Sequence, residues 1–206
     1  MSLLKLHDKH GAGKGRFLMA RYEELFNPLQ RVEIKLLELG IWRGGSLKMW
    51  RDYFVSHKSL VVGLDRDEKL MVNDEPRIKS YAGDQADEEL LAKLSQENAP
   101  EGFDIIIDDC SHIGSLTRKS FRYLFDNHLK AGGIYVIEDW FTGYRPPQKL
   151  EDGSIIDMYG GTSYIEGKNH LSGTVGFVKE LLDDLALKKT IERIVYFDLV
   201  VFVYKK

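Results

Sequence analysis

The chain has 206 residues, which is enough for one well-filled hydrophobic core but short for two full domains. Its formal net charge of -3 argues against a protein built to bind nucleic-acid backbones, because such proteins usually carry a surplus of Lys and Arg. Its single cysteine, Cys110, excludes an intramolecular disulfide and a cysteine-based zinc site. Met1–Arg16 does not resemble a signal peptide and no apolar run approaches the ~20 residues of a membrane helix, so we expect a cytoplasmic protein without membrane contacts.

Residues 1–32 are expected to form a partly helical leader around Arg16–Phe26. From Glu33 onward, short apolar runs alternate with amphipathic stretches, which is typical of helices layered on a parallel sheet. Five apolar runs are predicted to be strands covered on both faces: Ile34–Leu39, Leu60–Leu64, Arg77–Tyr81, Phe103–Ile107 and Ile134–Ile137. Three helices are predicted between them: one capped by Ser46, one over Asp84–Glu97, and one over Ser115–Leu129 that stops at Gly132-Gly133.

The last predicted helix spans Thr174–Leu187, and two apolar runs follow it, Thr190–Tyr196 and Leu199–Tyr204. Their close spacing favours an antiparallel pair over another crossover. Residues 141–171 are rich in Gly and Tyr, and a loop of this length is typical of a substrate lid or a binding segment. No internal repeat or linker interrupts the pattern, so the sequence predicts a single domain over residues 1–206.

A glycine turn follows the first predicted strand, where Gly40, Gly44 and Gly45 precede the predicted helix. Glycines let the backbone approach a ligand closely, and the helix N-terminus adds unpaired N–H donors. Any tight turn between a strand and a helix also favours glycine, so this turn alone is a weak sign of a cofactor.

Acidic residues follow the second and third predicted strands. Asp65 lies close to the ~20-residue offset from the glycine turn at which an acid binds ribose hydroxyls in dinucleotide folds, although a solvated acid explains it equally well. Asp84 can accept a hydrogen bond from an adenine amino group with Gln85 nearby, or instead cap the next helix. Because these residues follow successive strands, their side chains are expected at one edge of the sheet. Together they predict an adenosine-containing cofactor.

Two further acidic clusters end the fourth and fifth predicted strands: Asp108-Asp109, followed by His112, and Glu138-Asp139. Four carboxylates packed together would repel one another strongly without a cation. Their oxygens suit a hard divalent metal such as Mg²⁺, which keeps positions open for substrate oxygens. An isolated histidine is more often structural than catalytic, but His112 beside such a metal is a candidate general base.

Several short motifs carry a resemblance to a known family. In chain order they are Glu38-Leu-Gly, Gly44-Gly-Ser-Leu-Lys-Met-Trp50, Gly63-Leu-Asp65, Gly83-Asp-Gln85, Ile107-Asp-Asp-Cys-Ser-His112 and Gly132-Gly-Ile-Tyr-Val-Ile-Glu-Asp139. In this order they resemble the metal-dependent O-methyltransferases of macrolide sugars, and they are similar to the cephalosporin hydroxylase group, which shares that fold. The resemblance extends from about Asp8 to Trp140. We expect none of the additional N-terminal domain that some macrolide enzymes carry.

The resemblance implies a Rossmann-like class I methyltransferase fold: a mostly parallel seven-stranded sheet with an antiparallel C-terminal strand and helices on both faces. It implies S-adenosylmethionine and Mg²⁺, or another divalent cation, as cofactors. The cofactor-binding residues that it implies are Glu38, Gly40, Gly44, Ser46, Asp65, Asp84, Gln85 and Asp108. The metal ligands that it implies are Asp109, Glu138 and Asp139, while His112 falls on the family's catalytic base. Asp108 can serve either the metal or the cofactor.

The predicted function is metal-assisted, S-adenosylmethionine-dependent methylation of a hydroxyl on a small molecule such as a sugar, a polyketide or another natural product. A homo-oligomer is compatible with the sequence. A metal-dependent hydrolase using the same carboxylates and histidine is the alternative, and a non-catalytic interaction protein is a third class. A short-chain dehydrogenase is disfavoured, because glycines near Tyr164 and Lys168 oppose the helix that its Tyr-x-x-x-Lys pair requires. The Gly11–Gly15 stretch lacks the strand and the Ser or Thr of a phosphate loop and is predicted to be a flexible turn.

Overall fold

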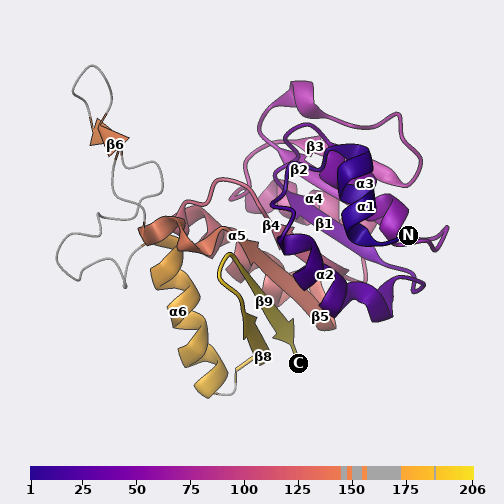
Figure 1. The fold of residues 1–206 in the computed structure, drawn as a ribbon. Coiled ribbons are helices and arrows are strands. Elements are labelled where there is room, and N and C mark those ends of the chain that lie inside the picture. The colour runs from indigo at the N-terminus through magenta and orange to yellow at the C-terminus, as the bar shows by residue number, and fades with distance from the viewer. Residues whose placement is uncertain (145–147, 150–154, 157–172, 188) are drawn as a thin grey trace.

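Seven strands of the chain form one sheet in the order β3-β2-β1-β4-β5-β9-β8 (Figure 1). The computed structural model describes residues 1–144, 148–149, 155–156, 173–187 and 189–206. The strands of the sheet are β1 Lys35–Leu39, β2 Leu60–Asp65, β3 Ile78–Ala82, β4 Phe103–Asp108, β5 Leu129–Glu138, β8 Ile191–Tyr196 and β9 Val200–Lys205. A separate pair joins β6, Gln148–Lys149, to β7, Ile155–Ile156.

The chain order of the strands reverses between β1 and β4. From β1 the chain moves outward through β2 to β3, and it then returns to the other side of β1 with β4. Strands β1 to β5 are parallel, whereas β9 is antiparallel to both β5 and β8, which confirms the predicted terminal pair. In open sheets of this kind, ligands bind outside the carboxyl ends of the strands where the order reverses. This reversal therefore points to the loops that follow β1 and β4.

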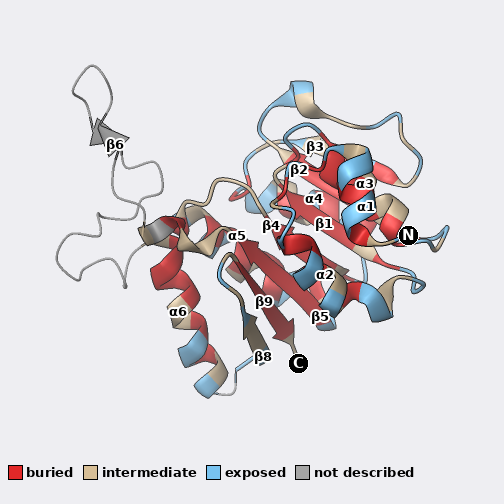
Figure 2. Ribbon diagram, viewed as in Figure 1, coloured by how far each residue is buried: buried red, intermediate tan, exposed pale blue. Residues whose placement is uncertain are grey.

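Helices cover both faces of the sheet, as the continuous apolar runs predict (Figures 1 and 2). The main helices are α1 Leu3–His10, α2 Leu18–Phe26, α3 Gly45–Tyr53, α4 Glu88–Asn98, α5 Gly114–Asn127 and α6 Gly173–Ala186. The short ones are η1 Asn27–Leu29, η2 Glu68–Leu70 and η3 Trp140–Tyr144. Neighbouring strand residues alternate between two cores: Leu36 packs with α1 to α3, and Leu37 packs with α4 to α6. No helix in the described part of the chain is long and apolar enough to cross a membrane.

The predicted cap at Ser46 is wrong, and Asp84 does not take the alternative role of a helix cap. Ser46 does not cap α3, because Gly44 takes the N-cap position in a left-handed conformation and the Ser46 hydroxyl instead donates to buried Glu38. At α4 the cap is Asp87, whose carboxylate accepts from the two backbone N–H groups of Glu89 and Leu90. In both cases the observed cap lies within three residues of the expected one, because each turn contains several residues of types that favour the N-cap position.

The glycine pair Gly132-Gly133 lies inside β5 rather than ending α5. Helix α5 ends at Asn127, and β5 already begins at Leu129, five residues before its predicted start. The register with β4 shifts early in this pairing, and Gly132 has a φ of +75° that disfavours side chains. The pair therefore marks an irregularity in a strand. The predicted lid, residues 141–171, lies mostly outside the described residues.

Candidate active site

The loops after β1 and β4 touch at Gly40. This glycine has a φ of +93°, and a Cβ on it would lie 2.2 Å from the carbonyl oxygen of Asp109. The Asp109 N–H in turn donates to the Leu39 carbonyl at 3.0 Å. Only glycine allows this approach, because a side chain would be both strained and in collision. The glycine turn and the first acidic cluster are thereby brought together at the point where the strand order reverses.

A cavity of about 320 Å³ opens beside this contact. It is lined by Ala12, Gly13, Gly40, Ile41, Trp42, Ser46, Asp65, Arg66, Leu70, Asp109, Cys110 and Ser111. Its volume lies within the ~300–1,000 Å³ that is typical of small-molecule sites. Predicted cofactor residues Gly40, Ser46 and Asp65 and predicted metal ligand Asp109 all line it, whereas Glu38, Gly44, Asp84, Gln85 and Asp108 are not among its lining residues.

Asp65 ends β2 at the rim of this cavity and is fixed by backbone donors. One carboxylate oxygen accepts from Ile41 N–H at 2.8 Å and from Trp42 N–H at 3.3 Å, and the other accepts from Asp67 N–H at 3.1 Å. An ionised carboxylate offers about four acceptor positions, so further donors can bind. The side chain is therefore oriented in advance and can still receive hydroxyl groups.

Asp108 and Gln85 form a buried polar pair that contacts Ser111 of the cavity wall. The Gln85 amide nitrogen lies 3.4 Å from both Asp108 oxygens, and its carbonyl accepts from Ser111 N–H at 3.2 Å. The Ser120 hydroxyl donates to Asp108 at 3.0 Å. Burial raises the pKa of Asp108 to about 6. Asp108 thus contacts a predicted cofactor residue, while the exposed Asp84 accepts from Ala86 N–H.

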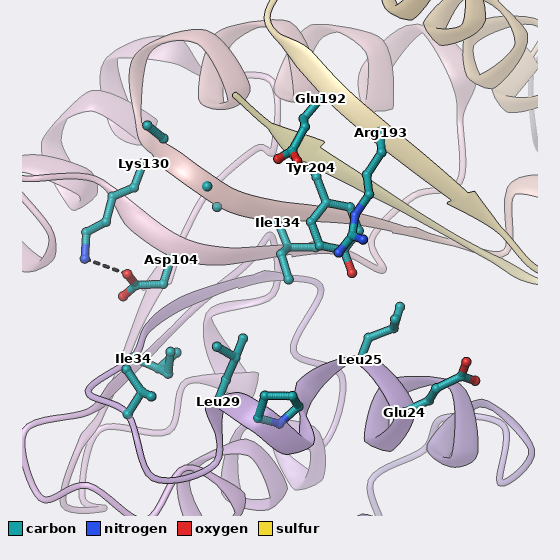
Figure 3. A pocket seen from close by; sticks show the side chains of 15 residues that line it. Glu24, Leu25, Leu29, Ile34, Asp104, Lys130, Ile134, Glu192, Arg193 and Tyr204 are labelled. Atoms are coloured by element: carbon teal, nitrogen blue, oxygen red, sulfur yellow. Dashed lines mark hydrogen bonds and ion pairs between the residues drawn. The ribbon is translucent and has the colours of Figure 1, made fainter.

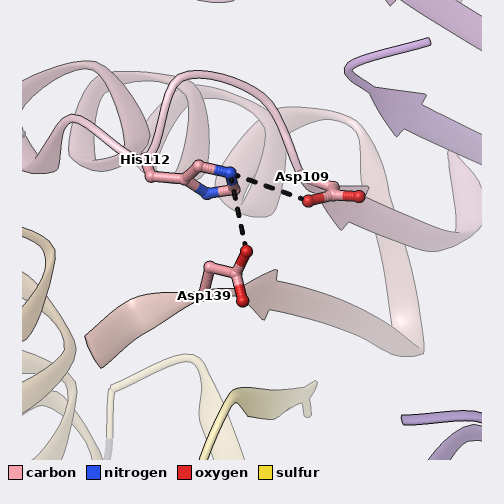
Figure 4. A group of neighbouring side chains, drawn as sticks. All are labelled: Asp109, His112 and Asp139. Carbon is pink, nitrogen blue, oxygen red and sulfur yellow. Dashed lines mark ion pairs between the residues drawn. The ribbon is translucent and has the colours of Figure 1, made fainter. Parts of the chain in front are cut away.

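Asp109, His112 and Asp139 converge at the carboxyl ends of β4 and β5 (Figure 4). Their ligand atoms lie within 4.8 Å of one another, and His112 Nε2 lies 3.8 Å from an oxygen of each aspartate. These separations are too long for hydrogen bonds. Two ligands on one ion with bonds of ~2.1 Å lie roughly 3.0–4.2 Å apart. The 3.8 Å separations fall in this range, and the carboxylate oxygens are donors that suit a hard divalent cation.

Two threonine hydroxyls contact the backbone of the loop that carries His112. The Thr174 hydroxyl, at the start of α6, donates to the His112 carbonyl at 2.9 Å, and the Thr142 hydroxyl in η3 lies 3.4 Å from the same oxygen. His112 has a φ of +55° and Asp139 a φ of +50°. Such conformations are uncommon for residues other than glycine and concentrate at functional sites.

Lys14 is the site residue that the sequence analysis missed. Its ammonium group is buried and contacts three carboxylates: Asp109 at 2.6 Å, Glu138 at 2.7 Å and Glu38 at 2.9 Å. The prediction of a flexible turn over Gly11–Gly15 did not anticipate this anchor. The available signal was indirect: two glutamates, Glu38 and Glu138, stand within apolar strand runs, and buried carboxylates require a cation or hydrogen-bond donors.

Glu38 and Glu138 are both satisfied by groups of the chain itself. Glu38 also accepts from the Ser46 hydroxyl at 2.6 Å and from the Trp50 indole at 3.3 Å. Glu138 also accepts from the Tyr22 hydroxyl at 2.5 Å. The structure therefore places Glu138 on Lys14 and not within the Asp109–His112–Asp139 group, and its role as a metal ligand stays a prediction.

The carboxylates around Lys14 carry more negative charge than one ammonium group balances. Although burial alone lowers it, the neighbouring charges of Asp109, Glu138 and Glu38 raise the pKa of Lys14 well above its ordinary value. Burial and the charge of Asp109 raise the pKa of Glu138 to about 8, against the hydrogen bonds from Lys14 and Tyr22. The electrostatics of this site therefore favour additional positive charge.

A second cavity, of about 530 Å³, lies at the opposite edge of the sheet (Figure 3). Ile34 precedes β1, Asp104 is the second residue of β4, and Lys130 is the second residue of β5, so the amino ends of the strands line it. The Asp104 carboxylate accepts from Lys130 at 2.7 Å, and Arg193 stacks on Tyr204. None of the predicted site residues lines this larger cavity.

Known proteins similar to this chain are methyltransferases. No protein-family model matches the sequence. Demethylmacrocin O-methyltransferase of Streptomyces fradiae is 38% identical over 180 residues, which are 84% of this chain and 41% of that protein. Mycinamicin VI 2''-O-methyltransferase of Micromonospora griseorubida is 37% identical over 170 residues, 79% of this chain and 38% of that protein. The chain thus spans about two fifths of the length of these relatives.

Solved structures with a similar fold are also methyltransferases. The MycE methyltransferase of the mycinamycin biosynthetic pathway, solved with Mg, SAH and mycinamycin VI, superposes on the whole chain with a TM-score of 0.80 and 31% identity, and the match covers 54% of that protein. The SAH-bound methyltransferase PaMTH1 of Podospora anserina, at 16% identity and a TM-score of 0.60, shares the fold alone. By sequence, the chain therefore belongs to the family of macrolide and sugar O-methyltransferases, and its sheet has the class I methyltransferase topology.

Proposed function

We propose that the chain transfers a methyl group from S-adenosylmethionine to a hydroxyl of a sugar on a small molecule, with Mg²⁺ or another divalent cation bound beside the cofactor. The observation that carries this proposal is the position of Asp109. It lines the cavity at the reversal of strand order, and it also offers an oxygen to the group formed with His112 and Asp139. The relatives named above, which methylate hydroxyl groups, support the same chemistry.

The cofactor is assigned to the 320 Å³ cavity. Gly40 and Ser46 would lie against its methionine part, with Glu38 and Gly44 shaping the turn behind them. Asp65 would receive the two ribose hydroxyls. The proposed adenine contacts are Asp84 and Gln85, and Asp108 supports Gln85 from below. For Asp65, Asp84 and Gln85, backbone N–H groups already hold the side chains in their orientations.

The metal is assigned to Asp109 and Asp139, and Glu138 stays a third predicted ligand, although Lys14 holds its carboxylate in this structure. When bound, the cofactor supplies a methyl group on a positively charged sulfur, and the divalent cation orients the acceptor hydroxyl and lowers its pKa. His112 then accepts the hydroxyl proton at Nε2, because this atom lies between the two aspartates and within reach of an oxygen held there. Positioning the two reactants together supplies much of the rate enhancement.

Calorimetric titration with S-adenosylhomocysteine, with Mg²⁺ present and after chelation, tests the cofactor assignment. We expect stoichiometric binding, followed by transfer of radiolabelled methyl groups to diols and glycosides in an assay that requires the metal. A folded protein that binds no S-adenosylhomocysteine would refute the methyltransferase and favour the metal-dependent hydrolase. The Tyr164 and Lys168 pair of the dehydrogenase alternative lies outside the described residues.

A further inference from the structure

Lys14 and the proposed metal site share one carboxylate. One oxygen of Asp109 contacts the Lys14 ammonium group at 2.6 Å, while the other oxygen faces His112 at 3.8 Å. Lys14 also holds Glu138, which directly precedes Asp139 at the end of β5. The Lys14 ammonium group therefore binds one oxygen of Asp109, which is assigned to the divalent ion, and one oxygen of Glu138, which is adjacent to the assigned ligand Asp139.

The chain fixes Lys14 in this position. A ring nitrogen of His7 in α1 lies 2.8 Å from the Lys14 carbonyl oxygen, which is within hydrogen-bonding distance. A Cβ on Gly13 would lie 2.4 Å from the Trp42 ring, and a Cβ on Gly45 would lie 2.5 Å from the Gly11 carbonyl. The loop thus packs directly against the glycine turn of the cofactor cavity. The ammonium group is buried, with 1% of the side chain exposed, so water does not screen its charge.

We propose that Lys14 is an internal counter-cation that competes with the divalent metal for the oxygens of Glu138 and Asp109. This proposal rests on the metal site of the proposed function. While Lys14 holds Glu138, the metal is left with Asp139 and the oxygen of Asp109 that faces His112. Removal of the ammonium group releases Glu138 and one oxygen of Asp109 to the metal.

The expected direction follows from charge. The ammonium group repels a divalent cation bound to the same aspartate, and in a buried site this repulsion is strong. Without Lys14, the carboxylates of Glu38, Asp109 and Glu138 are left uncompensated, so the metal-free protein is destabilised. Both effects make metal binding more favourable. A purely structural ion pair predicts the opposite, because loss of Lys14 would loosen the carboxylates and weaken metal binding.

The test is calorimetric titration of the full chain with Mn²⁺, which prefers the same oxygen ligands as Mg²⁺, in the absence of cofactor and acceptor. We expect Lys14→Met to bind Mn²⁺ at least ~10-fold more tightly than the wild type, and Lys14→Arg to stay within about threefold of it. The matched control is Lys5→Met, which removes an exposed lysine of the same helix α1, and we expect it to leave Mn²⁺ affinity unchanged. Unchanged or weaker binding to folded Lys14→Met overturns the proposal.

Glu138→Gln provides a second test, which remains informative even if Lys14→Met does not fold. In the wild-type background it should change Mn²⁺ affinity less than about threefold, because Lys14 already occupies this carboxylate. Combined with Lys14→Met, it should abolish most of the gain. A loss of tenfold or more from Glu138→Gln alone contradicts the competition. If no variant binds Mn²⁺, the metal of the proposed function fails, and this inference fails with it.

Discussion

His112 and Asp139 combine an unusual backbone conformation with the side chains proposed for chemistry. Both are non-glycine residues with positive φ, a conformation that costs of order 1–3 kcal/mol and persists only where the surroundings enforce it. For His112 the enforcing contacts are the hydroxyls of Thr174 and Thr142 on its carbonyl. The backbone therefore aims both side chains at one point before any ligand arrives.

His112→Ala should lower kcat by ~10²–10⁴-fold, because it removes the proposed general base. The S-adenosylhomocysteine affinity should remain within about threefold of the wild type, since this ligand is not assigned to the His112 side chain. Steady-state kinetics and calorimetry on the same preparations measure both. His57→Ala, at an exposed position, serves as the control. Full activity of His112→Ala would remove the base assignment.

Asp65→Ala should weaken S-adenosylhomocysteine binding by ~10–100-fold, because hydrogen bonds to a charged acceptor are worth about 1.5–3 kcal/mol. Part of the loss will come from the Ile41 and Trp42 amides, which the carboxylate now orients. Asp67→Asn is the control, since Asp67 caps η2 and does not line the cavity. Equal affinities of Asp65→Ala and the wild type for S-adenosylhomocysteine would show that Asp65 does not bind the ribose.

At the scale of elements, helix α1 is fastened to α3 by a charged cluster. Asp52 accepts from Lys9 at 2.9 Å, from His10 at 2.8 Å and from Arg51 at 2.9 Å. Although partial burial opposes it, these hydrogen bonds lower the pKa of Asp52 well below its ordinary value of 3.8. This fastening matters for the site, because α1 leads directly into the loop that carries Lys14.

The stability that Asp52 contributes should depend on pH. Its pKa is lower in the folded state than in the unfolded state, so the contribution is complete above about pH 5 and is lost as the pH falls through and below 3.8. Asp52→Asn should therefore destabilise the protein at pH 7, and the difference from the wild type should shrink toward pH 2. Urea unfolding followed by circular dichroism at several pH values measures this. A difference that is constant with pH would contradict it; the exposed Asp126→Asn is the control.

The contact between α5 and α6 depends on a glycine. A Cβ on Gly114 would lie 2.0 Å from the carbonyl carbon of Gly173, so the two helix starts meet backbone to backbone. Gly114→Ala should destabilise the protein by about 1–3 kcal/mol through overpacking, and it should also lower activity by displacing the loop of His112. The exposed neighbour Ser115→Ala should have little effect on either. Thermal unfolding and turnover of both variants test this, and an unchanged Gly114→Ala would show that the helices separate easily.

At the scale of the whole molecule, the sequence predicted the architecture better than the details. Each of the seven sheet strands overlaps with a predicted apolar run, since strands buried on both faces carry a local signal. The positions of the acidic clusters followed from the same strands. The contacts of Lys14 with Asp109 and Glu138 span 95 and 124 positions, and no local pattern reports such a pairing. The caps at Gly44 and Asp87 and the glycines in β5 depend on local alternatives of similar energy.

Ligands that bind the folded chain alone should raise its melting temperature. At a concentration of 100 times its Kd, S-adenosylhomocysteine contributes about 2.7 kcal/mol, which corresponds to about 5–11 °C for a domain of this size. Mg²⁺ should add to this shift and chelation should reverse the metal's part. Differential scanning fluorimetry measures both, with adenosine monophosphate as a control nucleotide. Equal shifts with adenosine monophosphate would indicate an unspecific nucleotide site.

Asp109 meets three parts of the molecule at once: its carbonyl lies against Gly40, one carboxylate oxygen lies on Lys14, and the other faces His112. A substitution that shifts Asp109 at one of these contacts therefore changes its contacts with the other two neighbours. Laboratory evolution toward new acceptors should make slow progress through residues that touch Asp109, because each gain in acceptor fit would disturb cofactor or metal binding. Libraries that leave these neighbours unchanged, together with Thr142 and Thr174 on the His112 carbonyl, avoid this constraint, so acceptor preference and catalytic competence can be selected separately.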